Sequence, residues 1–348
     1  MIRFARYKSK EFIFLISLYS KPIKTKRYIS RLQTIVFINC NNCIQEYSIH
    51  RKAHRVLPVV MMRDESQFWY INGKEHRDDL DENGRVLPAI VRSNVNQQWW
   101  KNGLRHRDDL DENGKTLPAI IESESQVWYK NGRCHRDDRD ENGKTLPAVI
   151  WVIGGQSWWK NGKCHRDDLD ENGRVLPAII WRNGDQYWYK NGKCHRDDKD
   201  ENGRILPAII WGNGNQCWYN DGKLHRDERD ENGRVLPVVV CSNGSLDWYK
   251  NGDLHRDDID ENGEVLPARI RRNGDKEWYK NGKRHRDDLD EKGRVLPTYI
   301  GKDGSLFWYK NGEKHRNDLD ENGRVLPAVI WNKGRKKEWW INGEKVSL

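Results

Sequence analysis

Residues 176–203 read Leu-Pro-Ala-Ile-Ile-Trp-Arg-Asn-Gly-Asp-Gln-Tyr-Trp-Tyr-Lys-Asn-Gly-Lys-Cys-His-Arg-Asp-Asp-Lys-Asp-Glu-Asn-Gly. Within this stretch, Asn191-Gly192 follows a Tyr- and Trp-rich run, which predicts a β-hairpin with a two-residue type I′ turn. Both central residues of that turn need positive φ, and Asn and Gly adopt it readily. Pro177 stands at the start of an Ala-Ile-Ile strand, where its missing N–H is tolerated. The stretch therefore predicts three strands and three turns.

The two-residue turn also sets the register of the hairpin. It pairs three sets of residues across the strands: Lys190 with Lys193, Tyr189 with Cys194, and Trp188 with His195. Successive pairs point to opposite faces of the sheet. The aromatic residues are thus expected on both faces.

The same stretch recurs along the chain about every 30 residues. Leu-Pro recurs with Pro58, Pro88, Pro118, Pro147, Pro177, Pro207, Pro237, Pro267, Pro297 and Pro327, and His-Arg recurs at His76, His106, His135, His165, His195, His225, His255, His285 and His315. A single hairpin is marginal in water, so neighbouring copies must stack. We expect an all-β fold: an elongated, solenoid-like tandem array of about ten antiparallel β-hairpin repeats over residues 54–348. Residues 1–53 form a basic N-terminal segment that we expect to be poorly ordered.

The net charge of +9 is concentrated at the N-terminus. Residues 1–57 hold 12 of the 62 Lys and Arg but 2 of the 53 Asp and Glu, so the remainder is close to neutral. We therefore expect no nucleic-acid partner for the array, and any attraction to anionic lipid belongs to the N-terminal segment.

The seven cysteines do not form a disulfide framework. Cys134, Cys164 and Cys194 hold the same position in successive copies, whereas Leu224 and Arg284 hold it elsewhere. This usage favours a reducing, intracellular compartment.

His106-Arg-Asp-Asp-Leu-Asp-Glu-Asn113 matches the catalytic-loop pattern of protein kinases, in which Asp is the base and Asn holds a metal ion. Seven copies carry the match, and no Gly-rich phosphate loop, Asp-Phe-Gly or Ala-Pro-Glu motif accompanies it. The match is therefore interpreted as accidental, and we expect the protein not to be an enzyme.

The acidic loops have the pattern Asp-x-Asp-Glu-Asn-Gly, with Glu228 replacing the first Asp once and Lys292 replacing the Asn once. This pattern is the front half of a calcium loop, with oxygen ligands at alternate positions. Counted from Asp109, the twelfth position is Ile120, where a complete loop needs a bidentate Glu. The same residues also suit an Asx-stabilised turn without metal. Both interpretations stay open, so calcium is the one candidate cofactor. Its candidate ligands are Asp79, Asp81, Asn83, Asp109, Asp111, Asn113, Asp138, Asp140, Asn142, Asp168, Asp170, Asn172, Asp198, Asp200 and Asn202.

The nine repeated histidines do not suggest a metal ladder, because each copy supplies only one. We interpret them as cross-strand partners of Trp with packing and hydrogen-bonding roles.

The Trp-Tyr-x-Asn-Gly-Lys-x-His-Arg core, followed by Pro-Ala-x-Ile, resembles variant MORN-type repeats of the kind found in long arrays in giant DNA viruses. The resemblance covers roughly residues 54–348, although the acidic loop is an insertion that the shorter family pattern lacks. It implies an extended sheet of hairpins, a scaffolding, dimerising or membrane-associated role, no catalysis, and a virion or host-cytoplasm location.

A long repetitive surface without convergent chemistry predicts an interaction scaffold for an unidentified protein partner. Its variable positions, Glu75, Arg105, Cys134, Leu224 and Lys314, would distinguish one copy from another. Alternatives are a calcium-binding repeat, and peripheral membrane attachment through residues 1–55, which combine a short apolar run at 12–19 with basic clusters. A homo-oligomer is also open.

Overall fold

The computed structural model describes residues 3–6, 13–16, 35–40, 43–48, 60–61, 66–92 and 96–347, with side chains for the last two ranges. Three predictions concern segments that lie mostly or wholly outside the described residues. They are the basic segment 1–53, the membrane-attachment segment 1–55 and the opening copy near residues 54–58. Within residues 1–53, β1 (Arg3–Arg6) pairs with β2 (Ile13–Ile16), and β3 (Ile35–Cys40) pairs with β4 (Cys43–Ser48). No helix among the described residues is long and apolar enough to cross a membrane.

The chain is all-β and consists of two units, residues 1–163 and 164–348. In the first unit an antiparallel ladder contains β5 (Val60–Met61), β6 (Gln67–Phe68), β9 (Ile90–Val91), β10 (Gln97–Gln98), β13 (Ile120–Ile121), β14 (Ser125–Val127), β17 (Val149–Trp151) and β18 (Gln156–Ser157). Short hairpins accompany it: β7 (Tyr70–Ile71) with β8 (Lys74–Glu75), β11 (Trp100–Lys101) with β12 (Leu104–Arg105), and β15 (Tyr129–Lys130) with β16 (Arg133–Cys134). β19 (Trp159–Lys160) follows, and β20 (Lys163–Cys164) contains the division between the units.

The second unit repeats this plan. Its ladder contains β21 (Ile179–Ile180), β22 (Gln186–Tyr187), β25 (Ile209–Ile210), β26 (Gln216–Cys217), β29 (Val239–Val240), β30 (Leu246–Asp247), β33 (Arg269–Ile270), β34 (Lys276–Glu277), β37 (Tyr299–Ile300), β38 (Leu306–Phe307), β41 (Val329–Trp331) and β42 (Lys336–Ile341), with β43 (Glu344–Val346) paired to β42. Its hairpins are β23 (Tyr189–Lys190) with β24 (Lys193–Cys194), β27 (Tyr219–Asn220) with β28 (Lys223–Leu224), β31 (Tyr249–Lys250) with β32 (Asp253–Leu254), β35 (Tyr279–Lys280) with β36 (Lys283–Arg284), and β39 (Tyr309–Lys310) with β40 (Glu313–Lys314). A short 3-10 helix, η1 (Asn332–Gly334), connects β41 to β42.

The predicted hairpin and its register are confirmed. Asn191 and Gly192 have φ of 53° and 85°, as a type I′ turn requires. Tyr189 pairs with Cys194, and the His195 N–H donates to the Trp188 carbonyl oxygen at 3.0 Å.

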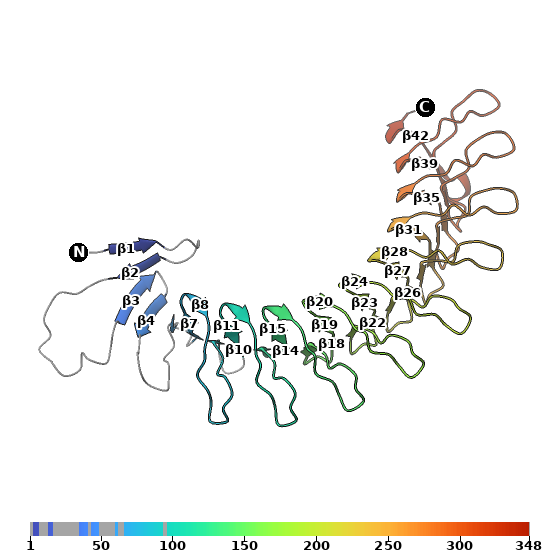
Figure 1. Cartoon of the computed structure of the whole chain (residues 1–348). Coiled ribbons are helices and arrows are strands. Elements are labelled where there is room, and N and C mark those ends of the chain that lie inside the picture. The colour runs from blue at the N-terminus through green and yellow to red at the C-terminus, as the bar shows by residue number, and fades with distance from the viewer. Residues whose placement is uncertain are drawn as a thin grey trace, which may run out of the picture. The chain divides into compact units, whose positions relative to one another are not determined.

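The structure divides the predicted second strand in two in each full copy, whereas β42 of the last copy is continuous. In the copy quoted above, β22 and β23 are separated by Trp188, whose N–H donates to the Ala208 carbonyl oxygen of the next copy. The Trp188 carbonyl oxygen accepts from the His195 N–H in the same hairpin. At Trp188 the chain therefore leaves the ladder that it shares with neighbouring copies and enters the hairpin of its own copy. In each unit of Figure 1 the hairpins lie on one side of the ladder and the acidic loops project from the other.

The core of each copy forms on the Trp side of the sheet, under its acidic loop. The Trp of each full copy is buried, and so is the residue after each Pro from Pro88 to Pro327, which is Ala except at Val238 and Thr298. The Trp188 indole N–H donates to the Val175 carbonyl oxygen at 2.7 Å, which joins the ring to the end of the preceding copy's acidic loop. Large rings are thus buried copy by copy, without a single large core.

Candidate functional site

The arginine of each His-Arg-Asp-Asp motif lies at the centre of the packing of its copy. The Arg256 guanidinium lies over the Trp248 ring, 3.9 Å from the ring centroid. Its Nε donates to Asp258 Oδ2 at 2.9 Å, and its Nη1 donates to the Pro267 carbonyl oxygen at 3.3 Å. Burial lowers the pKa of Arg256, and the hydrogen bond and ion pair with Asp258 oppose that shift. The Arg256 guanidinium is therefore held by a ring face, a carboxylate and a backbone carbonyl oxygen.

The last acidic residue of the motif joins two copies. Besides binding Arg256, Asp258 Oδ1 accepts from the Val235 N–H of the preceding copy at 3.1 Å. Equivalent bonds recur elsewhere: Val86 to Asp109, Thr116 to Asp138, Val175 to Asp198, Ile205 to Glu228, Val265 to Asp288 and Val295 to Asp318. This carboxylate is thus a link between neighbours.

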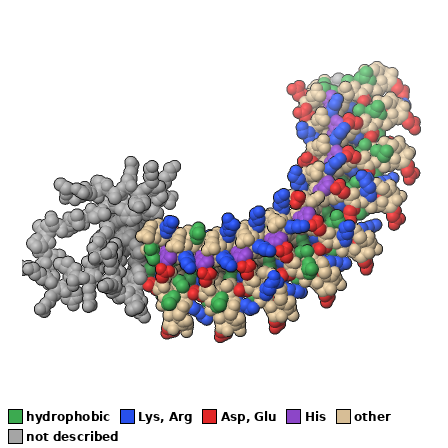
Figure 2. Space-filling view, in the orientation of Figure 1, with side chains coloured by type: hydrophobic (Ala, Val, Ile, Leu, Met, Phe, Trp, Pro, Cys, Tyr) green, Lys and Arg blue, Asp and Glu red, His purple; other side chains and the backbone are tan. Residues whose placement is uncertain are grey.

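The histidine of the motif links its copy to the following hairpin turn. The Asn311 N–H donates to His285 Nδ1 at 3.1 Å, and His285 Nε2 lies 2.7 Å from Asp287 Oδ1. Because Nδ1 accepts a bond from a backbone N–H, the ring carries its proton on Nε2, facing the carboxylate. Figure 2 shows these histidines as a row with acidic and basic side chains beside it. The predicted cross-strand pairing of His with Trp is confirmed by the backbone bond from the His285 N–H to the Trp278 carbonyl oxygen, and the ring forms further hydrogen bonds to its own motif and to the next copy.

The residues that match the kinase catalytic-loop pattern form the same structural contacts. The Asp108 carboxylate lies 2.6 Å from His106 Nε2, and Arg107 Nε donates to Asp109 at 2.8 Å. Both carboxylates of the motif are therefore bonded to basic side chains of the motif itself.

The candidate calcium ligands form hydrogen-bonded turns. Asp111 Oδ1 accepts from the Asn113 and Lys115 N–H groups at 2.8 and 2.9 Å, while Asp109 binds Arg107 and Val86. The turn recurs at Asp81 with Asn83, Asp140 with Asn142, Asp170 with Asn172 and Asp200 with Asn202, and the first acidic residue again binds the motif arginine at Asp79, Asp138 and Asp198. Over residues 66–92 and 96–347, no three His, Cys, Asp or Glu side chains are grouped as a metal site. Calcium binding by these loops stays a prediction.

The opposite side of the sheet carries residues that differ from copy to copy, and we call it the variable face. In each copy it comprises the residue before the core Trp, the aromatic residue after that Trp, and the second residue of the second hairpin strand. In the copy of Trp188 these are Tyr187, Tyr189 and Cys194. The ladder residues that lie opposite them belong to the same face. In the second unit it begins with an apolar cluster: Tyr187, Tyr189, Cys194, Ile209, Trp211, Cys217, Tyr219, Leu224 and Val239. Burial raises the pKa of the Cys194 and Cys217 thiols to about 12, so both are neutral packing groups.

Farther along the second unit the variable face becomes ionic. Glu277 is 1% exposed and binds Arg284 Nη2 and Arg271 Nη2, each at 2.8 Å, and accepts from the Tyr279 hydroxyl at 2.9 Å. Burial alone would raise the pKa of Glu277, but the hydrogen bonds from Arg284, Tyr279 and Arg271 hold it below its ordinary value. The carboxylate is therefore ionised and fully paired.

A second ion pair adjoins this cluster. Arg269 Nε and Nη2 donate to the two Asp247 oxygens at 2.7 and 2.8 Å. This bidentate bond raises the pKa of Arg269.

The predicted variable positions lie on this face. Arg105 lies over the Trp100 and Tyr129 rings, at 5.1 and 5.4 Å from their centroids, and Lys314 lies 4.5 Å from the Trp340 centroid. The sequence analysis missed Asp247, Arg269, Arg271 and Glu277, the ionic members of the face. Their signal was charge at strand positions that hold Ile, Val, Cys or aromatic residues in other copies.

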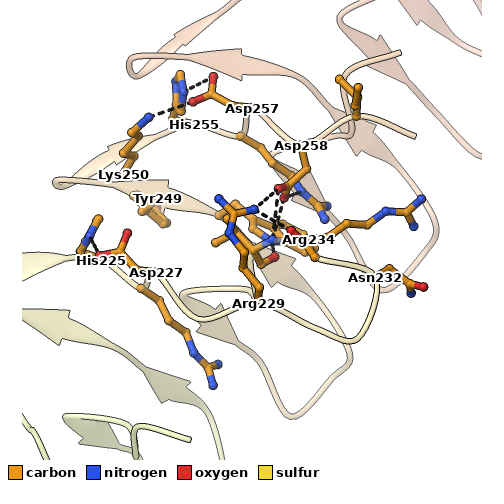
Figure 3. Close-up of a pocket in the computed structure, with 16 residues that line it drawn as sticks. His225, Asp227, Arg229, Asn232, Arg234, Tyr249, Lys250, His255, Asp257 and Asp258 are labelled. Atoms are coloured by element: carbon orange, nitrogen blue, oxygen red, sulfur yellow. Dashed lines mark hydrogen bonds and ion pairs between the residues drawn. The ribbon is translucent and has the colours of Figure 1, made fainter. Parts of the chain in front are cut away.

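A cleft of about 440 Å³ lies between two successive copies of the second unit (Figure 3). His225, Asp227, Lys250, Asp257 and Tyr249 line its hairpin side, and Arg229 and Arg234 line its loop side. An equivalent, smaller cleft of about 100 Å³ lies between the copies of His285 and His315. These clefts are grooves between repeats, and their lining includes linking residues described above, such as Val235, Arg256 and Asp258.

Comparison with models of protein families finds no match to the chain, and comparison with curated protein sequences finds none. The repeat architecture is therefore assigned from the internal repetition of the sequence and from the strand pairing. The resemblance to MORN-type repeats stays a prediction.

Replacing Arg256 by Met should lower the free energy of unfolding by about 3 kcal/mol, because the buried Asp258 carboxylate loses its close ion-pair partner and keeps only the 3.5 Å contact with the exposed Arg229. The side chains of Arg256 and Asp258 are 8% and 7% exposed. Urea unfolding of the full chain measures the change. Lys250→Met is the control, since Lys250 and Asp257 are 57% and 63% exposed, and should cost less than about 1 kcal/mol. Equal losses would refute the assigned role of Arg256.

Replacing Glu277 by Gln should destabilise the chain most at neutral pH. The folded pKa of Glu277 is below its ordinary 4.5, so its stabilisation is complete above pH 4.5 and is lost as the pH falls through the folded pKa. Gln98 occupies this position in another copy, so the amide suits the backbone. Urea unfolding at several pH values should show the difference between wild type and variant narrowing below pH 4.5. A difference independent of pH would contradict the ionised pairing.

For calcium, we expect thermal melts of the full chain in EDTA and in millimolar calcium to coincide. Asp111 Oδ1 already accepts two backbone bonds, and Asp109 is paired with Arg107, so the loop is closed without a metal ion. A calcium-dependent rise in Tm would show binding to the folded state and restore the metal interpretation.

Proposed function

We propose that the array is a non-enzymatic interaction scaffold whose variable face binds a protein partner. The observation that carries this proposal is the division of residues within each copy. The repeated residues, His-Arg-Asp-Asp, Trp and Asn-Gly, form the contacts within and between copies, as Arg256, Asp258 and His285 illustrate. Many of the residues that differ between copies lie on the variable face.

The variable face has the composition of a binding surface. Tyr189, Tyr219 and Trp211 are half-buried aromatic residues, and Leu224 lies among them. Half-buried Tyr and Trp supply large contact areas at low cost in side-chain entropy, and such residues anchor many protein interfaces. A continuous row of them suits an extended partner.

The ionic part of the face supports selectivity. Glu277 is fully paired, whereas the Arg271 and Arg284 side chains remain 48% and 33% exposed. An apolar segment beside an arginine-bearing segment favours a partner with the complementary order of apolar and acidic residues. Because the residues on this face differ from copy to copy, each part of the array presents its own pattern of apolar and charged groups.

Affinity capture with two charge variants tests the proposal. Leu224→Arg alters the variable face, and Leu289→Arg, the control, alters an acidic loop at a residue that is 55% exposed. Arginine occupies the equivalent positions in other copies, at Arg284 and Arg229, so both variants should fold. Equal Tm values for the two variants would confirm this.

We expect Leu224→Arg to lower the amount of captured partner by about tenfold, a change that corresponds to the loss of one anchor residue. Leu289→Arg should capture as much as the wild type. Identical captured proteins and amounts for both variants would refute the variable face as the binding surface.

A further inference from the structure

The turns that join the two ladder strands of each copy stack directly on one another in the second unit. The Arg272 N–H donates to Ser245 Oγ at 3.0 Å, and the Lys302 N–H donates to Asp275 Oδ1 at 2.9 Å. The Asn332 N–H donates to Ser305 Oγ at 3.0 Å. The last three turns thus form one continuous edge from residue 271 to residue 337.

This edge is strongly basic. It carries a set of exposed cationic residues that we call the basic ridge: Arg271, Arg272, Lys302, Lys333, Arg335, Lys336 and Lys337. The corresponding turns at 181–186, 211–216 and 241–246 carry no net charge, and neither does 301–306, where Asp303 offsets Lys302; the excess of positive charge lies in the turns at 271–276 and 331–337. The expectation that the array lacks a nucleic-acid partner rested on its summed charge, which conceals this local excess.

Most of the ridge is free to bind an anion. Arg271 binds Glu277, and Lys336 binds Glu338 at 2.8 Å. Within residues 66–92 and 96–347, Arg272, Lys302, Lys333, Arg335 and Lys337 form no ion pair. The carboxylate of Asp275 is occupied by the Lys302 N–H and the Tyr299 hydroxyl, and that of Asp303 by Ser305.

A shallow hollow of about 410 Å³ lies on the ridge. It is lined by Ser245, Arg271, Arg272, Asn273 and Lys302. The Arg272 guanidinium, the Lys302 ammonium group and the Ser245 hydroxyl are available as donors, whereas Arg271 gives its Nε and Nη2 to Glu277; no carboxylate lines the hollow. This set of donors fits a phosphate group, which guanidinium binds through paired N–H groups.

An aromatic ring stands beside the ridge. Trp331 precedes the last turn and is 38% exposed. Its ring makes an edge contact with Phe307 at 4.5 Å between centroids, and Phe307 stacks on Tyr299 at 4.7 Å. Trp331 is therefore supported from within and still presents part of its ring to a ligand.

We propose that the basic ridge binds the phosphate backbone of a single-stranded nucleic acid and that Trp331 stacks on one of its bases. A row of cations beside a supported aromatic ring is the combination by which proteins hold single strands with little sequence preference. Successive turns are two strands apart, about 10 Å, so the ridge offers contacts along an extended strand rather than to one small anion. An acidic peptide has no bases for Trp331, which favours nucleic acid. The ridge adjoins the variable face and shares Arg271 with it, but the variants that test it leave Arg271 and the proposed protein-binding residue Leu224 unchanged.

Fluorescence anisotropy of a short, labelled oligo(dT) with the full chain tests the site. Arg272→Ser, Lys302→Ser and Arg335→Ser together remove three cations, and Ser242 stands at the position of Arg272 in an earlier turn. We expect this triple variant to bind at least about tenfold more weakly at about 50 mM salt. The slope of log affinity against log salt should fall by about 2, since each phosphate contact of a single strand contributes about 0.7.

Trp331→Leu should weaken binding several-fold without changing the salt slope, because stacking carries no charge. Lys193→Ser combined with Lys223→Ser, which removes exposed charges from hairpin turns of the same unit, is the control and should bind as the wild type does. Tm values establish that each variant is folded.

Three results would overturn the proposal. One is no binding of oligo(dT) at low salt, and another is an equal loss of affinity in the Lys193/Lys223 control. The third is that a poly-glutamate peptide or phosphatidylserine vesicles bind as tightly as oligo(dT) and that Trp331→Leu has no effect. This result would identify the ridge as a surface that binds anions in general.

Discussion

The stacking of an arginine on a buried tryptophan is the contact on which the rest of each copy depends. The Arg196 guanidinium lies 3.8 Å from the Trp188 centroid and binds Asp198 and the Pro207 carbonyl oxygen. It draws the acidic loop over the ring and positions the carboxylate that binds the preceding copy. A buried guanidinium needs both an apolar face and several acceptors. The local sequence supplies all of them within twenty residues.

Repetition turns this local arrangement into an array. Each copy ends in groups that only a neighbour can satisfy: the hairpin-turn amide bonded to histidine, and the carboxylate bonded to a backbone N–H, as at Asn311 and Asp258. Stability is therefore shared between a copy and its interfaces, as expected of a one-dimensional repeat. Because the linking contacts use the same residues in every copy, the other side of the sheet is free to vary.

The residues of the variable face and of the turn edge change in character along the second unit. The variable face changes from the Cys and Tyr cluster around Cys217 to the ionic cluster around Glu277, and the turn edge changes from neutral to basic at Arg271. Average composition does not reveal these changes, because the repeated His-Arg-Asp-Asp motifs dominate the charge count. A repeat array is therefore best described copy by copy, with the repeated residues assigned to packing and the remainder to partners.

The sequence by itself determined the all-β class, the period, and the hairpin with its register, because Asn191-Gly192 and strand alternation act over a few residues. It also located the variable positions. It could not determine the partners of His285, Asp109 or Glu277, because their contacts join different turns and copies. The Asp-x-Asp-Glu-Asn-Gly pattern supplies the same oxygens to a metal ion or to a turn, and only the tertiary structure shows Asp111 bonded to backbone amides. The basic ridge likewise exists only because stacked turns bring together Arg272, Lys302 and Lys333, which are about thirty residues apart in the sequence.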